Sequence, residues 1–186
     1  MLTNSSKALI ELKDGGKIYT CNDTVKHAPG MEVSAGTRFD AYTWSYFFLL
    51  PYKLTDPGTH WAEHNGGGHN QGSFEAGMLR FDEGIGDTPK DWYVVYADKA
   101  TGRLNTAAYI VTAGASVDEA EADPHAIVYD QYKLVNGIPV ATEWSFYSWT
   151  EAEGLGQKLG RGTVSNIEFI DVHPERMDAP EGYAML

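Results

Sequence analysis

Three histidines in one short segment carry the side chains best suited to metal chemistry. His60 and His64 lie four positions apart, with Glu63 between them, and His69 follows a run of three glycines. Imidazoles four residues apart share one face of a helix and can bind a transition metal ion. His60, His64 and His69 are therefore candidate metal ligands, and a metal-dependent hydrolase using this segment is one alternative for the function.

The glycines at 66–68 favour a second interpretation of the same segment. Three consecutive glycines interrupt a helix, and a glycine-rich loop supplies few of the ordered contacts that hold metal ligands in place. On this interpretation the histidines lie on a solvent-exposed loop. We then expect a binding protein that needs no cofactor, rather than an enzyme.

Composition and charge restrict the class of protein. The 186 residues fit a single domain spanning 1–186, and 42% hydrophobic residues are enough for a core. Twenty glycines, eight prolines and many aromatic residues favour short strands joined by tight turns. The net charge is −12, without a cluster of Lys or Arg that could follow a phosphate backbone. We therefore predict a mainly β protein that does not bind nucleic acid.

No segment of the sequence resembles a membrane span or a signal peptide. No run approaches the roughly 20 apolar residues that cross a bilayer. The first residues, MLTNSSKALIELKDGG, lack the apolar core of a secretory signal. The single Cys21 excludes an internal disulfide. We expect a soluble chain without a transmembrane segment.

The clearest local signal is a long β-hairpin over 125–149. Asn136-Gly137 provides the positive φ angles of a two-residue type I′ turn between two runs rich in β-branched and aromatic residues. Further strands are predicted at 7–13, 17–21, 74–81, 91–97, 103–113 and 161–170. Residues 22–36 and 60–72 are expected to be loops, residues 151–160 a glycine-rich connection, and residues 117–122 a loop or a single helical turn.

One helix is expected between residues 37 and 51. Apolar residues recur there near helical spacing, Thr37 or Asp40 can cap the start, and Pro51 is expected to end it. A buried strand is the alternative, because aromatic residues are dense in this segment. The predicted fold class is mainly β (α+β), a curved antiparallel sheet or half-barrel with one main helix on its concave face.

Three stretches resemble a known superfamily. The strand-turn-strand run DWYVVYADKATGRLNTAAYIV, the hairpin YDQYKLVNGIPVATEWSFY and the closing stretch GRGTVSNIEFIDVHPERMDAPEGY are similar, in this order, to the bacterial outer-membrane lipoprotein carriers, the lipoprotein localisation factors. The segment from LLPYKLTDPG onward, with EGIGDTPKDWYVVY, is more narrowly similar to an uncharacterised bacterial family on that fold. The resemblance covers residues 39–183.

The resemblance implies a half-barrel around helical segments, with an apolar cavity that holds acyl chains and no catalytic residues. It implies a cell-envelope or periplasmic location. The chain as given starts without the long N-terminal helix and first strands that the superfamily implies, and without a signal peptide.

A non-enzymatic module that binds a lipid or acyl chain is therefore our first hypothesis for the function. A structural or oligomerising module, such as a homodimer, is a further alternative. Large aromatic residues could line the apolar cavity or simply form the core, and the candidates are Trp44, Phe47, Phe48, Tyr109, Trp144 and Phe146.

Overall fold

The protein is mainly β, with 42% of its residues in strands and 16% in helices. The structure is a computed structural model that describes residue 1 and residues 7–22, 24–69 and 72–186. The chain gathers into two compact units, one formed by residues 54–169 and the other by residues 1–53 with 170–186. The organisation as a single domain over 1–186 stays a prediction.

The larger unit, 54–169, is built on a seven-stranded antiparallel sheet. Its order is β10-β9-β8-β7-β6-β5-β4, so each strand pairs with its neighbour in sequence. Within the described residues β10 and β4 form the two edges, and the sheet is not closed into a barrel. The strands are β4 (Thr59–Glu63), β5 (Phe74–Phe81), β6 (Tyr93–Asp98), β7 (Leu104–Tyr109), β8 (His125–Val135), β9 (Ile138–Thr150) and β10 (Gly154–Thr163).

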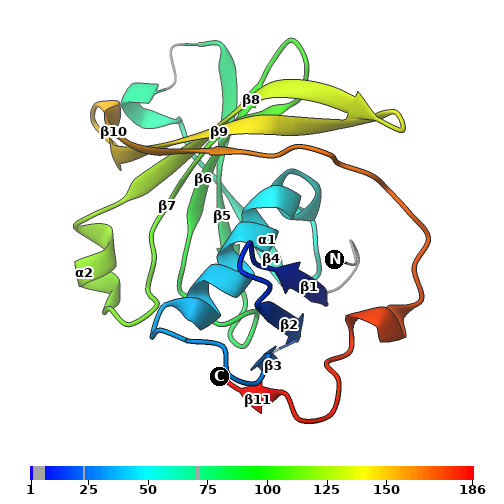
Figure 1. The fold of residues 1–186 in the computed structure, drawn as a ribbon. Helices are drawn as coiled ribbons and strands as arrows, with labels where there is room; N and C mark the ends of the chain where they lie inside the picture. Colours follow the sequence, from blue (N-terminus) through cyan, green and yellow to red (C-terminus); the bar gives the residue numbers. More distant parts are fainter. Residues whose placement is uncertain (2–6, 23, 70–71) are drawn as a thin grey trace. The chain divides into compact units, whose positions relative to one another are not determined.

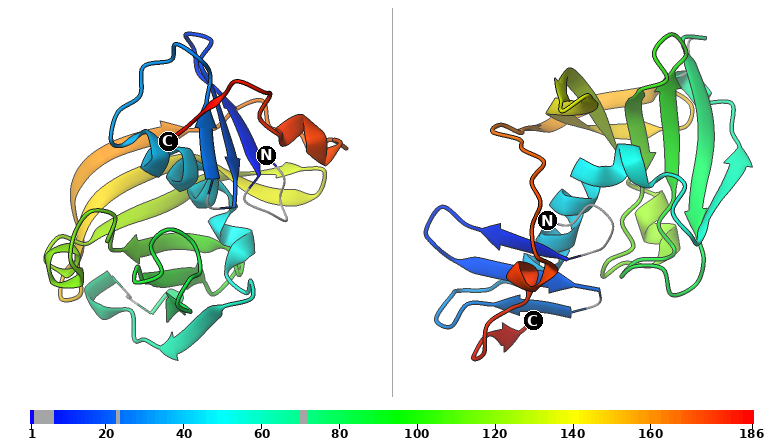
Figure 2. Two further views of the ribbon diagram at one scale, coloured as in Figure 1. Left: turned by 90° about the horizontal axis from the view of Figure 1, so that it is seen from below. Right: turned by 90° about the vertical axis from the view of Figure 1, so that its right-hand side faces the viewer.

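The seven-stranded sheet is strongly curved. In Figure 1 the strands β5, β6 and β7 run in a markedly different direction from β8, β9 and β10, and Figure 2 shows the same change from two other sides. Accumulated right-handed twist between neighbouring strands produces this shape. The predicted curved antiparallel sheet is therefore confirmed.

The two faces of the sheet carry different sets of side chains. Alternation along each strand and the observed register assign every residue to one face. We call one the Trp92 face; its buried cluster consists of Trp92, Val94, Tyr96, Ala108, Ile110, Ala120, Ala126 and Trp149. We call the other the Tyr93 face; it carries Tyr93, Val95, Ala107, Tyr109, Ile127, Tyr129, Trp144 and Phe146.

A five-residue helix belongs to the Trp92 face. Helix α2 (Val117–Glu121) contributes the buried Ala120 to the cluster. Its start is fixed by a capping box, because the Ser116 hydroxyl accepts from the backbone N–H of Glu119 while the Glu119 carboxylate accepts from the backbone N–H of Ser116. The single helical turn that the sequence allows here is thus confirmed.

The last strand of this unit differs from the sequence-based prediction. We expected a connection at 151–160 and a strand at 161–170, but β10 spans Gly154–Thr163. Glycine is unfavourable in strands, which is why the sequence favoured a connection here. A Cβ atom at Gly160 would lie 3.8 Å from the Phe146 ring and one at Gly162 would lie 3.6 Å from the Trp144 ring, which are ordinary contact distances. The strand therefore forms through its pairing with β9, and these two positions have room for a small side chain.

The edge strand β4 was also absent from the sequence-based prediction. Residues 60–63 were expected to be loop, but they belong to β4, which pairs with β5 from Thr59 opposite Phe81 to Glu63 opposite Gly77. Trp61 covers Gly77 so closely that a Cβ atom there would lie 2.9 Å from its ring. The Trp61 indole also donates a hydrogen bond to the carbonyl of Leu54, at 2.9 Å.

The smaller unit combines a four-stranded sheet with the main helix. The sheet order is β1-β2-β3-β11, with β1 (Ala8–Glu11), β2 (Lys17–Cys21), β3 (Thr24–His27) and β11 (Ala184–Met185). Strand β3 lies where we expected only loop. Its Val25 is fully buried and packs with Ile18 and with Ala41 of the helix. The chain end closes this sheet, since the backbone N–H of Leu186 donates to the Val25 carbonyl.

The predicted helix is confirmed as α1 (Thr37–Lys53), and the alternative strand is wrong. Pro51 lies inside its last turn and does not end it, contrary to our expectation. In the described part of the chain no helix is both long and apolar enough to cross a membrane. The placement of α1 on the concave face of the seven-stranded sheet stays a prediction.

The turn between β8 and β9 has the predicted geometry and allows a clean test. Asn136 and Gly137 have φ angles of 50° and 83°, as a type I′ turn requires. No atom lies within 4 Å of a Cβ placed on Gly137, so Gly137→Ala changes only the backbone energy. We expect a loss of about 1–2 kcal/mol in the free energy of unfolding, measured with urea. Gly160→Ala, at an ordinary φ, is the control; equal losses would contradict the turn assignment.

Candidate functional site

The first histidine of the predicted cluster lies on the edge strand β4. His60 donates from Nε2 to Oδ1 of Asp82 at 2.6 Å. A carboxylate only accepts hydrogen bonds, so Nε2 carries the proton in this contact. Both side chains are more than half exposed to solvent. The contact is therefore a surface hydrogen bond, which contributes little to stability.

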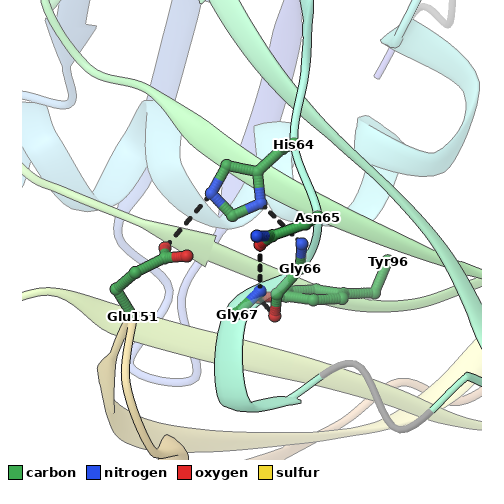
Figure 3. A network of polar contacts seen from close by, with 6 residues as sticks. All are labelled: His64, Asn65, Gly66, Gly67, Tyr96 and Glu151. Carbon is green, nitrogen blue, oxygen red and sulfur yellow. Dashed lines mark hydrogen bonds and ion pairs between the residues drawn. The ribbon is translucent and has the colours of Figure 1, made fainter.

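The second histidine lies at the centre of the polar network in Figure 3. His64 follows β4, and its side chain is only 13% exposed. Its Nδ1 accepts from the backbone N–H of Gly66 at 2.9 Å, and its Nε2 lies 3.1 Å from Oε2 of Glu151 in the turn after β9. The Asn65 side chain accepts from the backbone N–H of Gly67 at 2.8 Å.

These contacts determine the tautomer of His64. Because Nδ1 faces a backbone N–H, it accepts and carries no proton. The proton is therefore on Nε2, which donates to the Glu151 carboxylate. His64 is neutral in this arrangement, so its contact with Glu151 is a hydrogen bond rather than an ion pair. Both ring nitrogens are already engaged, and binding a metal would require one of these hydrogen bonds to break.

The third histidine is packed among aromatic rings. His69, at the end of the short 3₁₀ helix η1 (Gly67–His69), stacks on Phe74 with ring centroids 5.5 Å apart and meets the edge of Tyr96 at 4.7 Å. Its Nε2 lies 3.2 Å from the Thr106 hydroxyl, which itself donates to Asn105. His69 is therefore the donor in this pair. Desolvation by burial lowers the pKa of His69 below its ordinary value.

The structure thus gives the three histidines separate partners. His60 contacts Asp82, His64 contacts Glu151, and His69 contacts Thr106 and two rings. Among the residues that the structure describes, no three His, Cys, Asp or Glu side chains are grouped so that they could hold a metal ion. The metal site at His60, His64 and His69 stays a prediction.

The glycine run has a role that the sequence did not reveal. Residues 66–68 lie directly on the β9–β10 turn, where the backbone N–H of Gly68 donates to the Glu151 carbonyl at 2.9 Å. A Cβ atom at Gly67 or Gly68 would lie 2.2 Å or 2.1 Å from the carbonyl oxygen of Glu151 or Ala152. Only glycine permits this approach of two backbones.

The buried Tyr96 forms a hydrogen bond with the glycine loop at 66–68. The Tyr96 hydroxyl, on the Trp92 face, donates to the carbonyl of Gly66 at 3.0 Å. Burial raises the pKa of Tyr96 far above its ordinary value, and the nearby Glu151 charge adds to this, whereas the Trp149 indole N–H acts in the opposite direction. The hydroxyl therefore keeps its proton and remains a hydrogen-bond donor over the physiological range.

The predicted apolar-site residues fall in two groups. Tyr109, Trp144 and Phe146 lie on the Tyr93 face of the seven-stranded sheet. Trp44, Phe47 and Phe48 lie on α1, which belongs to the other compact unit. On that helix Phe47 is buried, whereas Trp44 is 49% exposed.

Register adds further aromatic side chains to the first group. Phe81 meets the edge of Tyr93 at 6.0 Å, Tyr93 packs on Tyr109 at 5.8 Å, and Tyr109 stacks on His125 at 6.1 Å. On β8 and β9, Tyr129 meets the edge of Trp144 at 6.1 Å. We call Phe81, Tyr93, Tyr109, His125, Tyr129 and Trp144 the aromatic row. Single-strand patterns could not reveal it, because it depends on how five strands align.

Comparison of the chain with protein-family models, with curated proteins and with solved structures found no match. The similarity to the lipoprotein carriers stays a prediction.

The close approach of the glycine loop to the β9–β10 turn predicts the effect of one added methyl group. Gly68→Ala places its Cβ against the Ala152 carbonyl, and backbone atoms cannot move aside as a flexible side chain can. We expect a loss of about 2 kcal/mol or more in unfolding free energy, measured with urea. Gly160→Ala, with its nearest atom at 3.8 Å, should cost less than about 1 kcal/mol. A near-neutral Gly68→Ala would contradict the contact.

The half-buried imidazole of His69 predicts how the stability of the fold depends on pH. Because the pKa of His69 is lowered in the folded state, the unfolded chain takes up a proton first as pH falls through about 6.5. The stability contributed by neutral His69 is present above this pH and is lost as pH falls. An NMR titration of the six histidines should show His69 protonating below its ordinary range. Protonation of His69 at or above about pH 6.5 would contradict its environment.

Proposed function

We propose that the protein is a non-enzymatic binding module that takes an apolar ligand, such as an acyl chain, on the Tyr93 face of its seven-stranded sheet. The observation that carries this proposal is the aromatic row, which crosses five neighbouring strands on one face. Four of its six side chains, those of Tyr93, Tyr109, Tyr129 and Trp144, are shielded from solvent. An apolar, aromatic lining with few polar groups is typical of sites for small apolar ligands. The predicted resemblance to acyl-chain carriers agrees with the proposal.

The environment of Tyr109 supports an apolar ligand over a polar one. Tyr109 is 8% exposed, and burial raises its pKa to about 12. Such a shift means that a charge is poorly solvated at this point of the Tyr93 face. A polar ligand would lose its hydration here without gaining partners, whereas an acyl chain has no such hydration to lose.

The size of the ligand follows from the energy that binding requires. Burying a methylene contributes roughly 0.8 kcal/mol, and association costs at least about 4 kcal/mol. A dissociation constant of about 1 µM corresponds to about −8 kcal/mol, so roughly fifteen methylenes must be buried. Acyl chains of the length found in common membrane lipids meet this requirement, and short-chain acids do not.

The hydrolase alternative has less support in the structure. Each of its three histidines already donates from Nε2 to a separate acceptor. His64 also accepts at Nδ1, so it has no lone pair available to take a proton from a nucleophile. We therefore do not propose catalysis by this segment.

Adjacent positions on β9 provide a matched test. Phe146 and Tyr147 are both half-buried and point to opposite faces of the sheet. Binding of oleate can be followed by displacement of a fluorescent fatty acid. We expect Phe146→Gln to weaken binding about five- to thirtyfold, through loss of about 1–2 kcal/mol of apolar contact, and Tyr147→Gln to leave it unchanged. Circular dichroism shows whether both variants remain folded.

Two outcomes would overturn the proposal. One is the absence of saturable oleate binding by the unsubstituted protein up to about 100 µM, which is a hundredfold above the dissociation constant of about 1 µM considered above. The other is equal binding by the Phe146→Gln and Tyr147→Gln variants.

A further inference from the structure

A small hollow opens on the Trp92 face, separate from the proposed acyl-chain surface. Its volume is about 350 Å³, within the range of small-molecule sites. Met78 of β5, Trp92 and Trp149 form its apolar wall, with Ala122 and Pro124 of the α2–β8 connection. Thr150 and two carboxylates, Glu121 and Glu151, complete the lining.

The walls are held in place by specific contacts. The two indole rings meet edge to face, with centroids 6.2 Å apart. The Trp92 indole donates to Oε1 of Glu121 at 3.1 Å, which fixes that carboxylate at the border of the hollow. The backbone N–H of Trp149 donates to the Pro124 carbonyl at 3.0 Å. The hollow is thus bordered by α2, the start of β6 and the end of β9, all within one compact unit.

Both carboxylates accept hydrogen bonds from neutral groups. Glu121 accepts from the neutral Trp92 indole, and Glu151 accepts from His64 in its neutral tautomer. In the described part of the chain, neither forms an ion pair with a Lys or Arg side chain. The hollow therefore combines two carboxylates that have no Lys or Arg partner with an aromatic and thioether wall, in a protein whose net charge is −12.

We propose that this hollow binds a small organic cation, namely a protonated primary amine attached to an apolar group. The apolar group would pack against Met78, Trp92 and Trp149, while the ammonium group donates to the carboxylates of Glu121 and Glu151. Tryptophan is the aromatic side chain that attracts cations most strongly. A neutral apolar ligand would leave the two charges without a partner, and an anion would be repelled by them.

The test uses 2-phenylethylamine as the probe and benzyl alcohol, which is uncharged at neutral pH, as its comparison. Two-dimensional NMR of the five indole N–H groups follows both ligands. We expect the amine to shift the Trp92 and Trp149 signals saturably, while Trp44 and Trp61 stay unchanged. Benzyl alcohol should bind about fivefold more weakly, since one charge contact at a partly exposed site contributes about 1 kcal/mol.

Variants that replace a carboxylate by an amide test whether Glu121 and Glu151 bind the ammonium group. Glu121→Gln and Glu151→Gln keep an oxygen acceptor for Trp92 and His64, so the local structure is retained. We expect each to weaken amine binding about three- to fivefold and the double variant about tenfold or more. Glu153→Gln, in the same turn as Glu151 but outside the hollow, is the control and should bind as the unsubstituted protein does.

The proposal is overturned by any of three results. These are no saturable shift with the amine up to about 10 mM, equal affinity for the amine and the alcohol, or undiminished binding by the double variant. Because acyl chains and amines are assigned to opposite faces of the sheet, either proposal can fail while the other stands.

Discussion

The structure of the larger unit depends on the contact between the glycine run at 66–68 and the β9–β10 turn. The hydrogen bond from Gly68 to Glu151 joins the segment after β4, at one edge of the sheet, to the turn that leads into β10, at the other. The approach is too close for any side chain larger than hydrogen. His64, in the same segment as the glycines, and Tyr96, on β6, add hydrogen bonds to this contact, so one backbone constraint organises several polar groups.

This contact explains why the histidine segment has the side chains of a metal site in the sequence, while in the fold these side chains contact the backbone and neighbouring rings. His64 and His69 sit where they satisfy the backbone or fill space between rings, as buried polar groups must. The same contact holds Glu151 beside the hollow on the Trp92 face, because its side chain accepts from His64. The loop that joins the two edges of the sheet therefore also positions a carboxylate of the neighbouring hollow.

Much of the fold could be predicted because residues close together in the sequence determine the turns, the main helix and several strands. The Asn136-Gly137 turn, the helix over 37–53 and the alternation in 74–81 depend on neighbouring residues alone. Strand β10 could not be predicted in this way, because its glycines favour a connection and its pairing with β9 depends on the arrangement of the sheet. The aromatic row depends likewise on register, and the roles of His64 and Glu151 depend on a contact between residues 87 positions apart.

We propose that the Tyr93 face binds an acyl chain in the cell. Native mass spectrometry of protein purified from cells, followed by lipid extraction of the same sample, tests this binding directly. We predict a co-purifying acyl-containing species at a defined ratio to the protein, lost on extraction. An empty protein that appears as a dimer would contradict the claim and would favour a module that assembles with its own copy.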